Sequence, residues 1–192
     1  MNDDNQSADR RVLRTRRALR DAMISLLVEQ GWDDINIQDL CDRADVGRST
    51  FYMHFQNKEE LLVSGLNDLR GALQAQATSS RQRAAGAMPF VRGLIEHVYE
   101  QRMLFKSIIG RRSGHVVQKR FREMVTQLVD DDVSRLASAS WQRDAGAHYL
   151  AGALAGLLSW WMDAGNALSA DDIESHFHRL TLPVIKQLGG KN

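Results

Sequence analysis

A group of side chains that can hydrogen-bond to nucleic acid lies close together around position 50. Its members are Arg48, Ser49, Thr50, Tyr52 and His54. An arginine guanidinium can pair with guanine through two hydrogen bonds, and Ser or Thr hydroxyls can bond to several bases. Tyr52 and the nearby Lys58 suit backbone phosphates, which position a protein on DNA without distinguishing sequences. These residue types at this spacing predict a surface that contacts double-stranded DNA.

Two short helices joined by a tight turn would position this group. The first helix is indicated by an apolar face at helical spacing, formed by Ile37, Leu40, Cys41 and Ala44. Asn36 can cap its start, with the carboxylate of Asp39 in the first turn. We expect Gly47 to adopt unusual backbone angles in the turn, and the second helix to follow it and bury Phe51 and Phe55. In such a helix-turn-helix the second helix lies in the major groove.

The wider run resembles the DNA-binding domain of the TetR family of transcriptional regulators. Its pattern is Gly31-Trp32, then Ile37-x-x-Leu40, then Ala44-x-Val46-Gly47-x-Ser49-Thr50-Phe51-Tyr52-x-His54-Phe55-x-Asn57-Lys58-Glu59-x-Leu61. The resemblance covers roughly residues 10–65, and Asn36 stands where Thr is frequent in the family. The stretch 156–165 also resembles the C-terminal domains of some members. The resemblance implies an all-α protein, with an N-terminal three-helix helix-turn-helix DNA-binding domain followed by a helical ligand-binding and dimerisation domain.

Basic residues gather just before this pattern. The stretch 10–20 contains no acid and holds Arg10, Arg11, Arg14, Arg16, Arg17 and Arg20. We expect a clamp for DNA phosphates there, although a solvated helix face is the alternative. The net charge of +1 is not that of a non-specific nucleic-acid coat protein. The predicted DNA contacts are Gln38, Arg48, Ser49, Thr50, Tyr52, His54, Lys58 and Arg14.

Composition fits this fold class. The chain has 192 residues, 43% of them hydrophobic, and only 2 prolines, which favours an all-α globular protein. No apolar run is long enough to span a bilayer, and the polar, acidic start does not suggest a signal peptide. The single cysteine fits a reducing cytoplasm. We expect a mobile tail over 1–9, the DNA-binding domain over 10–56 and the ligand-binding and dimerisation domain over 57–192.

Two apolar helix faces near the C-terminus are candidates for a subunit interface. In the TetR family the two C-terminal helices of each subunit form a four-helix bundle across a two-fold axis, so the resemblance implies a homodimer. The expected interface residues are Ala147, Ala151, Leu154, Leu158, Trp161, Ile173, Phe177, Leu180 and Val184. The alternative is that these faces form the internal core of one chain.

A small-molecule effector is implied by the resemblance, and its identity is not evident from the sequence. Candidate residues for an apolar pocket are Tyr99, Met103, Phe105, Phe121, Met124, Trp141 and Trp160, although such residues are often ordinary core. No phosphate-binding glycine loop, nucleophile elbow or metal-ligand spacing occurs, so we expect no enzyme, cofactor or metal. The function expected is a cytoplasmic repressor that leaves a palindromic operator when it binds its effector. The alternative is a helical protein-interaction module with a purely structural helix-turn-helix.

Overall fold

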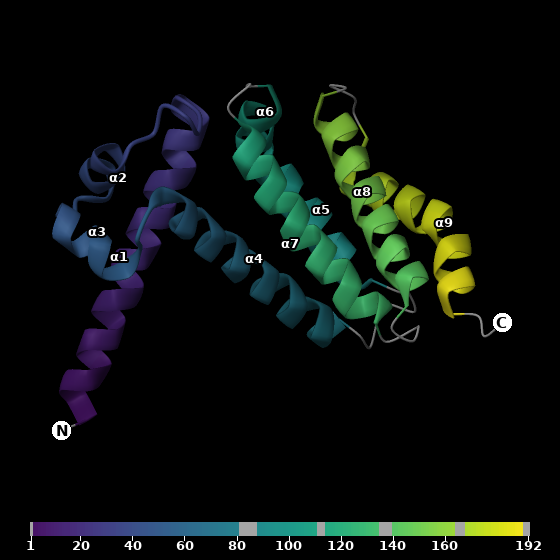
Figure 1. The fold of residues 1–192 in the computed structure, drawn as a ribbon, viewed down its shortest axis with the longest axis horizontal. Coiled ribbons are helices and arrows are strands. Elements are labelled where there is room, and N and C mark those ends of the chain that lie inside the picture. The colour runs from purple at the N-terminus through teal and green to yellow at the C-terminus, as the bar shows by residue number, and fades with distance from the viewer. Residues whose placement is uncertain (1, 81–87, 111–113, 135–139, 164–167, 190–192) are drawn as a thin grey trace.

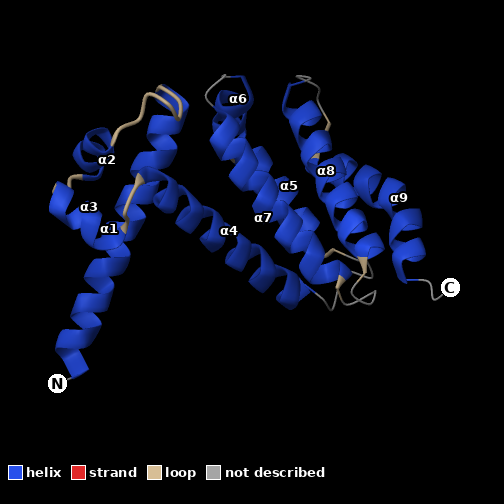
Figure 2. Ribbon diagram, in the orientation of Figure 1, coloured by secondary structure: helices blue, strands red, loops and turns tan. Residues whose placement is uncertain are grey.

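The computed structural model describes residues 2–80, 88–110, 114–134, 140–163 and 168–189 of the chain. Within these ranges the protein consists of helices joined by loops, with no strand (Figure 2). The all-α prediction is confirmed. In chain order the helices are α1 (Asn2–Glu29), α2 (Ile37–Ala44), α3 (Arg48–His54), α4 (Lys58–Ser80), α5 (Phe90–Glu100), α6 (Arg102–Gly110), α7 (His115–Val133), α8 (Trp141–Asp163) and α9 (Ala170–Gly189).

Helix α1 is longer than the sequence suggested. We expected residues 1–9 to form a mobile tail, but α1 begins at Asn2. The stretch 2–9 contains neither proline nor glycine, the two residue types that most disfavour a helix. The structure gives this stretch as helix, and its mobility stays a prediction. In Figure 1 this end of α1 projects away from the remaining helices.

The N-terminal head, which we define as α1 to α3, has a core of its own. Leu19 from α1, Leu40 from α2 and Phe51 from α3 are completely buried in it. Trp32 and Ile35, from the loop after α1, pack into the same core. The fit of residues from three helices fixes how α3 is presented. Residues from further along the chain complete this core, because Leu61 and Leu62 of α4 and Val117 of α7 are also part of it.

Helix α4 joins the head to the body, which we define as α5 to α9. Its first turn is capped by the Asn57 side chain, which accepts a hydrogen bond from the backbone N–H of Glu60 over 2.9 Å. Leu61 lies in the head core and Leu73 in the body core, and Leu66 packs against both. The helix that starts at the predicted domain boundary therefore belongs to both cores.

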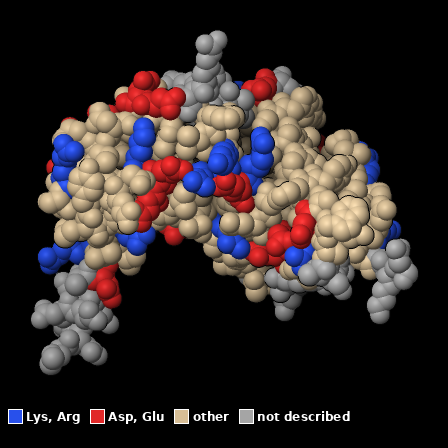
Figure 3. Space-filling model, in the orientation of Figure 1, with Lys and Arg blue, Asp and Glu red and all other residues tan. Residues whose placement is uncertain are grey.

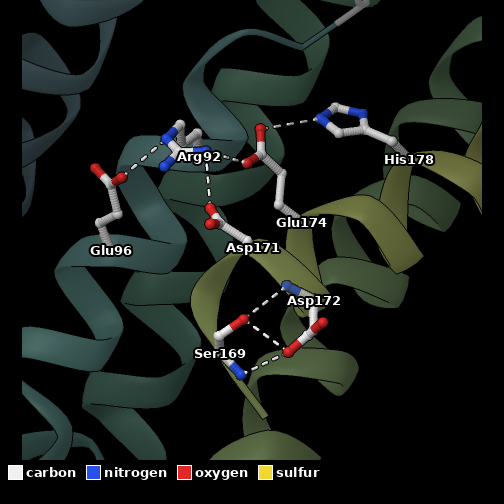
Figure 4. Close-up of polar contacts among 7 residues, drawn as sticks. All are labelled: Arg92, Glu96, Ser169, Asp171, Asp172, Glu174 and His178. Carbon is white, nitrogen blue, oxygen red and sulfur yellow. Dashed lines mark hydrogen bonds and ion pairs between the residues drawn. The ribbon is translucent and has the colours of Figure 1, made fainter.

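The body is a layered group of helices around one continuous core (Figure 1). Helix α5 packs against α9, and α8 packs against both α7 and α9. Figure 4 shows the polar side of the α5–α9 contact, where Arg92 lies within 3.0 Å of carboxylate oxygens of Glu96, Asp171 and Glu174. The start of α9 is held by a capping box, because the Ser169 hydroxyl accepts from the backbone N–H of Asp172 and the Asp172 carboxylate accepts from that of Ser169.

The apolar faces predicted as a subunit interface pack inside the single chain instead. Most of the set is at most 3% exposed, and its buried members are Ala147, Ala151, Leu154, Leu158, Trp161, Ile173 and Phe177. Side chains already covered by their own chain cannot cover a partner, so this part of the prediction was wrong. Leu180, at 60% exposure, and the half-buried Val184 remain accessible. The helical spacing of apolar residues identified the buried faces of α8 and α9 correctly. It did not show whether a partner subunit or other helices of the same chain cover these faces.

Candidate nucleic-acid interface and ligand cavity

The turn between α2 and α3 is set by local hydrogen bonds and one left-handed residue. The Asn36 side chain accepts from the backbone N–H of Asp39, and the Asp39 carboxylate accepts from that of Asn36, which confirms the predicted cap. After α2 the unusual angles belong to Asp45, with φ 52° and ψ 50°. Gly47 has an ordinary φ of −73°, so the role expected of it was wrong. Aspartate tolerates the left-handed region better than most residues do.

Helix α3 buries one face and turns its polar side chains the other way. We call these side chains, Arg48, Ser49, Thr50, Tyr52 and His54, the polar row. Phe51 is 0% exposed and Phe55, just after the helix, is 2% exposed, whereas Tyr52 is 50% exposed. The predicted contacts divide into exposed Arg48, Ser49 and Tyr52 and half-buried Thr50 and His54. Within the described part of the chain, none of these polar side chains forms a hydrogen bond. The row is therefore free to bond to an external partner.

Two other predicted contacts already have partners within the chain. The ammonium of Lys58 donates to the backbone carbonyls of Trp32 and Ile35, over 2.8 and 2.7 Å. The Gln38 side-chain amide donates to the carboxylate of Asp42, over 2.7 Å on the same helix. A DNA contact by Lys58 or Gln38 stays a prediction, and it would share or replace these bonds.

The arginines of α1 have different partners. Arg16 donates to the Ser64 hydroxyl of α4 over 3.0 Å and stacks over the Phe55 ring, and Arg20 forms an ion pair with Asp68. These two arginines attach α4 to α1. Arg14, the predicted phosphate contact, is exposed and forms no ion pair within the described residues. On the side of the molecule drawn in Figure 3, basic groups are interspersed with acidic ones. The net charge is only +1, so we expect any attraction for DNA to be local.

The helix-turn-helix is also tied to the end of α1. The Arg43 guanidinium of α2 donates to both carboxylate oxygens of Glu29, over 2.7 and 2.6 Å. Hydrogen bonds from Arg43, and then from Ser25, lower the pKa of Glu29 to about 2. A carboxylate that stays charged in acid keeps this two-bond contact through most of the pH range.

A cavity of about 450 Å³ lies between the head and the body. This is within the range of roughly 300–1,000 Å³ typical of small-molecule sites. Its wall comes from α1, α4, α5, α6, α7 and α8, and consists of Arg17, Arg20, Asp21, Met23, Ile24, Leu27, Leu61, Leu62, Gly65, Leu66, Leu69, His97, Leu104, Phe105, Val117, Gln118, Phe121, Arg122, Ala155, Leu158 and Ser159. Any molecule that filled it would touch the first helix of the head as well as helices of the body.

Two protein-family models match this chain. The model described as "Bacterial regulatory proteins, tetR family" matches residues 19–64, which include α2 and α3. The model described as "Transcriptional regulator C-terminal region" matches residues 87–182, half of the chain. The chain belongs to the TetR family of transcriptional regulators.

Individual relatives of this TetR-family protein are distant. An uncharacterised HTH-type transcriptional regulator of Bacillus subtilis, YxbF, is 28% identical over 169 residues, covering 83% of this chain and 42% of its own length. The HTH-type transcriptional repressor KstR of Mycobacterium tuberculosis is 35% identical over 77 residues, covering 40% of this chain and 34% of its own. The chain spans less than half the length of these curated relatives. A solved TetR regulator of Streptococcus agalactiae has a TM-score of 0.65 at 24% identity, covering 92% of this chain and 98% of that one, which shows the same fold.

The pocket residues predicted from sequence divide into three groups. Phe105 and Phe121 line the cavity, with their rings edge to face 5.2 Å apart. Met124 is buried in the body core and is not part of the cavity wall. The remaining four lie outside the cavity and are between 47% and 75% exposed: Tyr99, Met103, Trp141 and Trp160. Of the predicted set, Phe105 and Phe121 belong to this cavity, and a ligand contact by the other five stays a prediction. An apolar residue type marks burial or a surface patch as readily as a pocket.

Sequence reasoning missed the wall contributed by the head. Arg17, Ile24 and Leu27 of α1 line the cavity, as do Arg122 of α7 and His97 of α5. No local pattern could have shown this, because the wall exists only where α1 packs near α6 and α7. Among the described residues no group of His, Cys, Asp and Glu is suited to hold a metal ion. In the same ranges, none of the helices has the length and apolarity needed to cross a membrane.

Proposed function

We propose that the protein is a ligand-responsive repressor that binds a palindromic operator as a homodimer and is released by a small molecule. The observation that carries this proposal is the polar row of α3, where Arg48, Ser49 and Tyr52 are exposed and without hydrogen-bond partners in the described structure. Such side chains suit base edges and phosphates when their helix lies in the major groove. Repression is supported by the relative KstR, which is described as a repressor.

A dimer would form on the outward faces of α8 and α9. Tyr149 and Trp160 of α8 are 61% and 51% exposed, and Leu180 of α9 is 60% exposed. Between the two aromatic residues, Gly152 and Gly156 lie one helical turn apart, and a Cβ at either would meet nothing within 4 Å. Glycines permit close backbone approach, and among the described residues no packing contact requires a glycine at either position. A two-fold dimer would present two α3 helices to half-sites about 34–36 Å apart.

The cavity between head and body is the proposed effector site. Its wall includes α1 and α4, so a bound molecule would contact the elements that hold α3 in position. Further contacts tie the body to α1 and to α4. The Ser107 hydroxyl of α6 donates to the Leu27 carbonyl of α1 over 3.0 Å, and Arg120 of α7 donates to Glu59 of α4 over 2.6 Å. A ligand shifts the spacing of the two heads only as far as it binds one arrangement more tightly than the other.

The test is a selection of random duplex DNA on the purified full chain, followed by sequencing of the retained DNA. We expect a palindrome whose half-sites match the spacing of two α3 helices. Absence of any enriched sequence, at low salt and with a folded protein, would contradict the proposal and favour a protein-interaction module.

Arg48→Ala then tests the role of α3. We expect the variant to lose roughly 1–3 kcal/mol of binding free energy and to relax base preference at one position of each half-site. Lys119→Gln is the matched control, because Lys119 is an exposed cation on α7, far along the chain from α3. Equal weakening on all sequences would make Arg48 a phosphate contact instead.

A further inference from the structure

The wall of the head–body cavity is mostly aliphatic and aromatic. Helix α4 contributes four leucines, and α6 and α7 contribute Phe105 and Phe121. A wall of this kind favours an apolar body of limited size, because burial of apolar surface supplies most of the binding free energy. Apolar lining alone does not distinguish a neutral ligand from the apolar part of a charged one.

The charged residues of the wall make that distinction. Arg20 is neutralised by its ion pair with Asp68. The guanidinium groups of Arg17 and Arg122, from α1 and α7, form no hydrogen bond, ion pair or ring contact within the described residues. Asp21 is the single carboxylate of the wall, and it too forms no ion pair there. Among the described residues, the wall therefore has two positively charged side chains without an ion pair, Arg17 and Arg122, and one negatively charged side chain without an ion pair, Asp21.

The remaining titratable group of the wall adds no charge. His97 of α5 is half-buried, and burial lowers the pKa of its imidazole below the usual value, against a smaller opposite effect of Glu100. The imidazole is therefore neutral at neutral pH. Together with the Ser159 hydroxyl of α8, it gives the wall a neutral polar part, contributed by helices that lie well apart from α1 in Figure 1.

We propose that the cavity binds an amphipathic organic anion, whose apolar body packs against the leucines of α4 and Phe121 and whose anionic group pairs with Arg17 and Arg122. This inference rests on the proposed function for its regulatory consequence, but the ligand class concerns the cavity alone. A guanidinium suits such a group because it can donate two parallel hydrogen bonds to a carboxylate or phosphate. The anion would bridge a helix of the head and a helix of the body.

Three probes of equal chain length isolate the charge: decanoate, decanol and decylammonium, each used below its micelle-forming concentration. Binding to the full chain is measured by calorimetry and by the shift of the thermal midpoint, which rises with any ligand that prefers the folded state. We expect decanoate to bind about tenfold more tightly than either of the others. From octanoate to decanoate, affinity should rise roughly fourfold for each added methylene.

Matched variants locate the site. Arg122→Gln should weaken decanoate roughly three- to tenfold, a modest change because the guanidinium is exposed, and should leave decanol unchanged. Lys119→Gln removes one positive charge from the same helix outside the cavity wall and should alter neither affinity. Ala155→Leu adds bulk to the α8 part of the wall and should shift the preference toward shorter acids. Circular dichroism confirms that each variant is folded.

The outcomes separate the ligand class from the proposed function. Equal binding of decanol, tighter binding of decylammonium, or no binding of any probe would overturn the anionic class and leave operator binding untouched. Equal loss of decanoate binding in Lys119→Gln would overturn the site. Decanoate binding that depends on Arg122 but does not weaken the complex with the selected DNA would support the ligand class and contradict release by a small molecule.

Discussion

The side-chain ammonium of Lys58 bonds to the backbone carbonyls of both Trp32 and Ile35, over 2.8 and 2.7 Å. It also lies 4.7 Å from the centre of the Trp32 ring. Burial lowers the pKa of Lys58 below its usual value, against smaller opposite effects of Asp33, Asp34 and Asp39. A residue that the sequence suggested for DNA phosphates thus connects the first turn of α4 to the loop between α1 and α2.

We expect Lys58→Met to destabilise the head by about 1–3 kcal/mol, since two carbonyls lose a charged donor. Urea unfolding followed by circular dichroism measures the change, with Lys119→Met as the control for loss of an exposed cation. If stability is unchanged while binding to every DNA sequence weakens equally, the principal role of Lys58 is a phosphate contact.

Arg14→Gln should reduce the salt dependence of DNA binding. Each phosphate contact contributes about 0.9 to the slope of log affinity against log salt, because a bound phosphate releases its counterion. We expect weakening on all sequences alike and a smaller slope, measured by fluorescence anisotropy at several salt concentrations. An unchanged slope would show that Arg14 belongs to a solvated helix face, the alternative that the sequence left open.

The contact between Glu29 and Arg43 predicts a loss of stability in acid. The folded pKa of Glu29, about 2, lies below the usual value of 4.5, so its contribution is complete above 4.5 and is lost as the pH falls toward 2. We expect Arg43→Gln to be less stable than the unmodified protein at neutral pH, with the difference shrinking over this range. Urea midpoints across the range test this, and a constant difference would contradict the assignment.

Two glycines offer a matched test of the proposed dimer. A Cβ added at Gly156 of α8 or Gly71 of α4 would meet nothing within 4 Å, so alanine should stabilise either helix by roughly 0.5–1 kcal/mol within one chain. We expect Gly71→Ala to follow this rule. Gly156→Ala should instead weaken association, measured by sedimentation equilibrium, because the added methyl group separates the two subunits. Identical behaviour of the two variants would show that this face of α8 is open to solvent.

Features set by neighbouring residues were predictable from the sequence. The cap at Asn36 and Asp39, the cap at Asn57 and the burial of Phe51 each depend on residues a few positions apart. At that range the side-chain type and the helical period determine the contact. The position of α3 relative to α2 followed from the same local rules, with the exception that Asp45 took the left-handed conformation expected of a glycine.

Features set by packing across the chain were not predictable. The face of α8 that contains Leu154 is apolar at helical spacing, which is equally consistent with a subunit interface and with the chain's own core. The cavity unites Arg17 and Arg122 from helices far apart in sequence, and no pattern within either helix indicates the other. Deciding these points requires knowing which helices are neighbours in space.

Val117, a residue of the seventh helix, is 4% exposed and completes the core of the head. The DNA-binding part of this protein is therefore not a self-contained module that could be exchanged freely between regulators. A chimera that joined this head to the body of another family member would need a side chain of similar volume at that position. Recombination within the family would then favour exchanges that carry the head together with the start of α7.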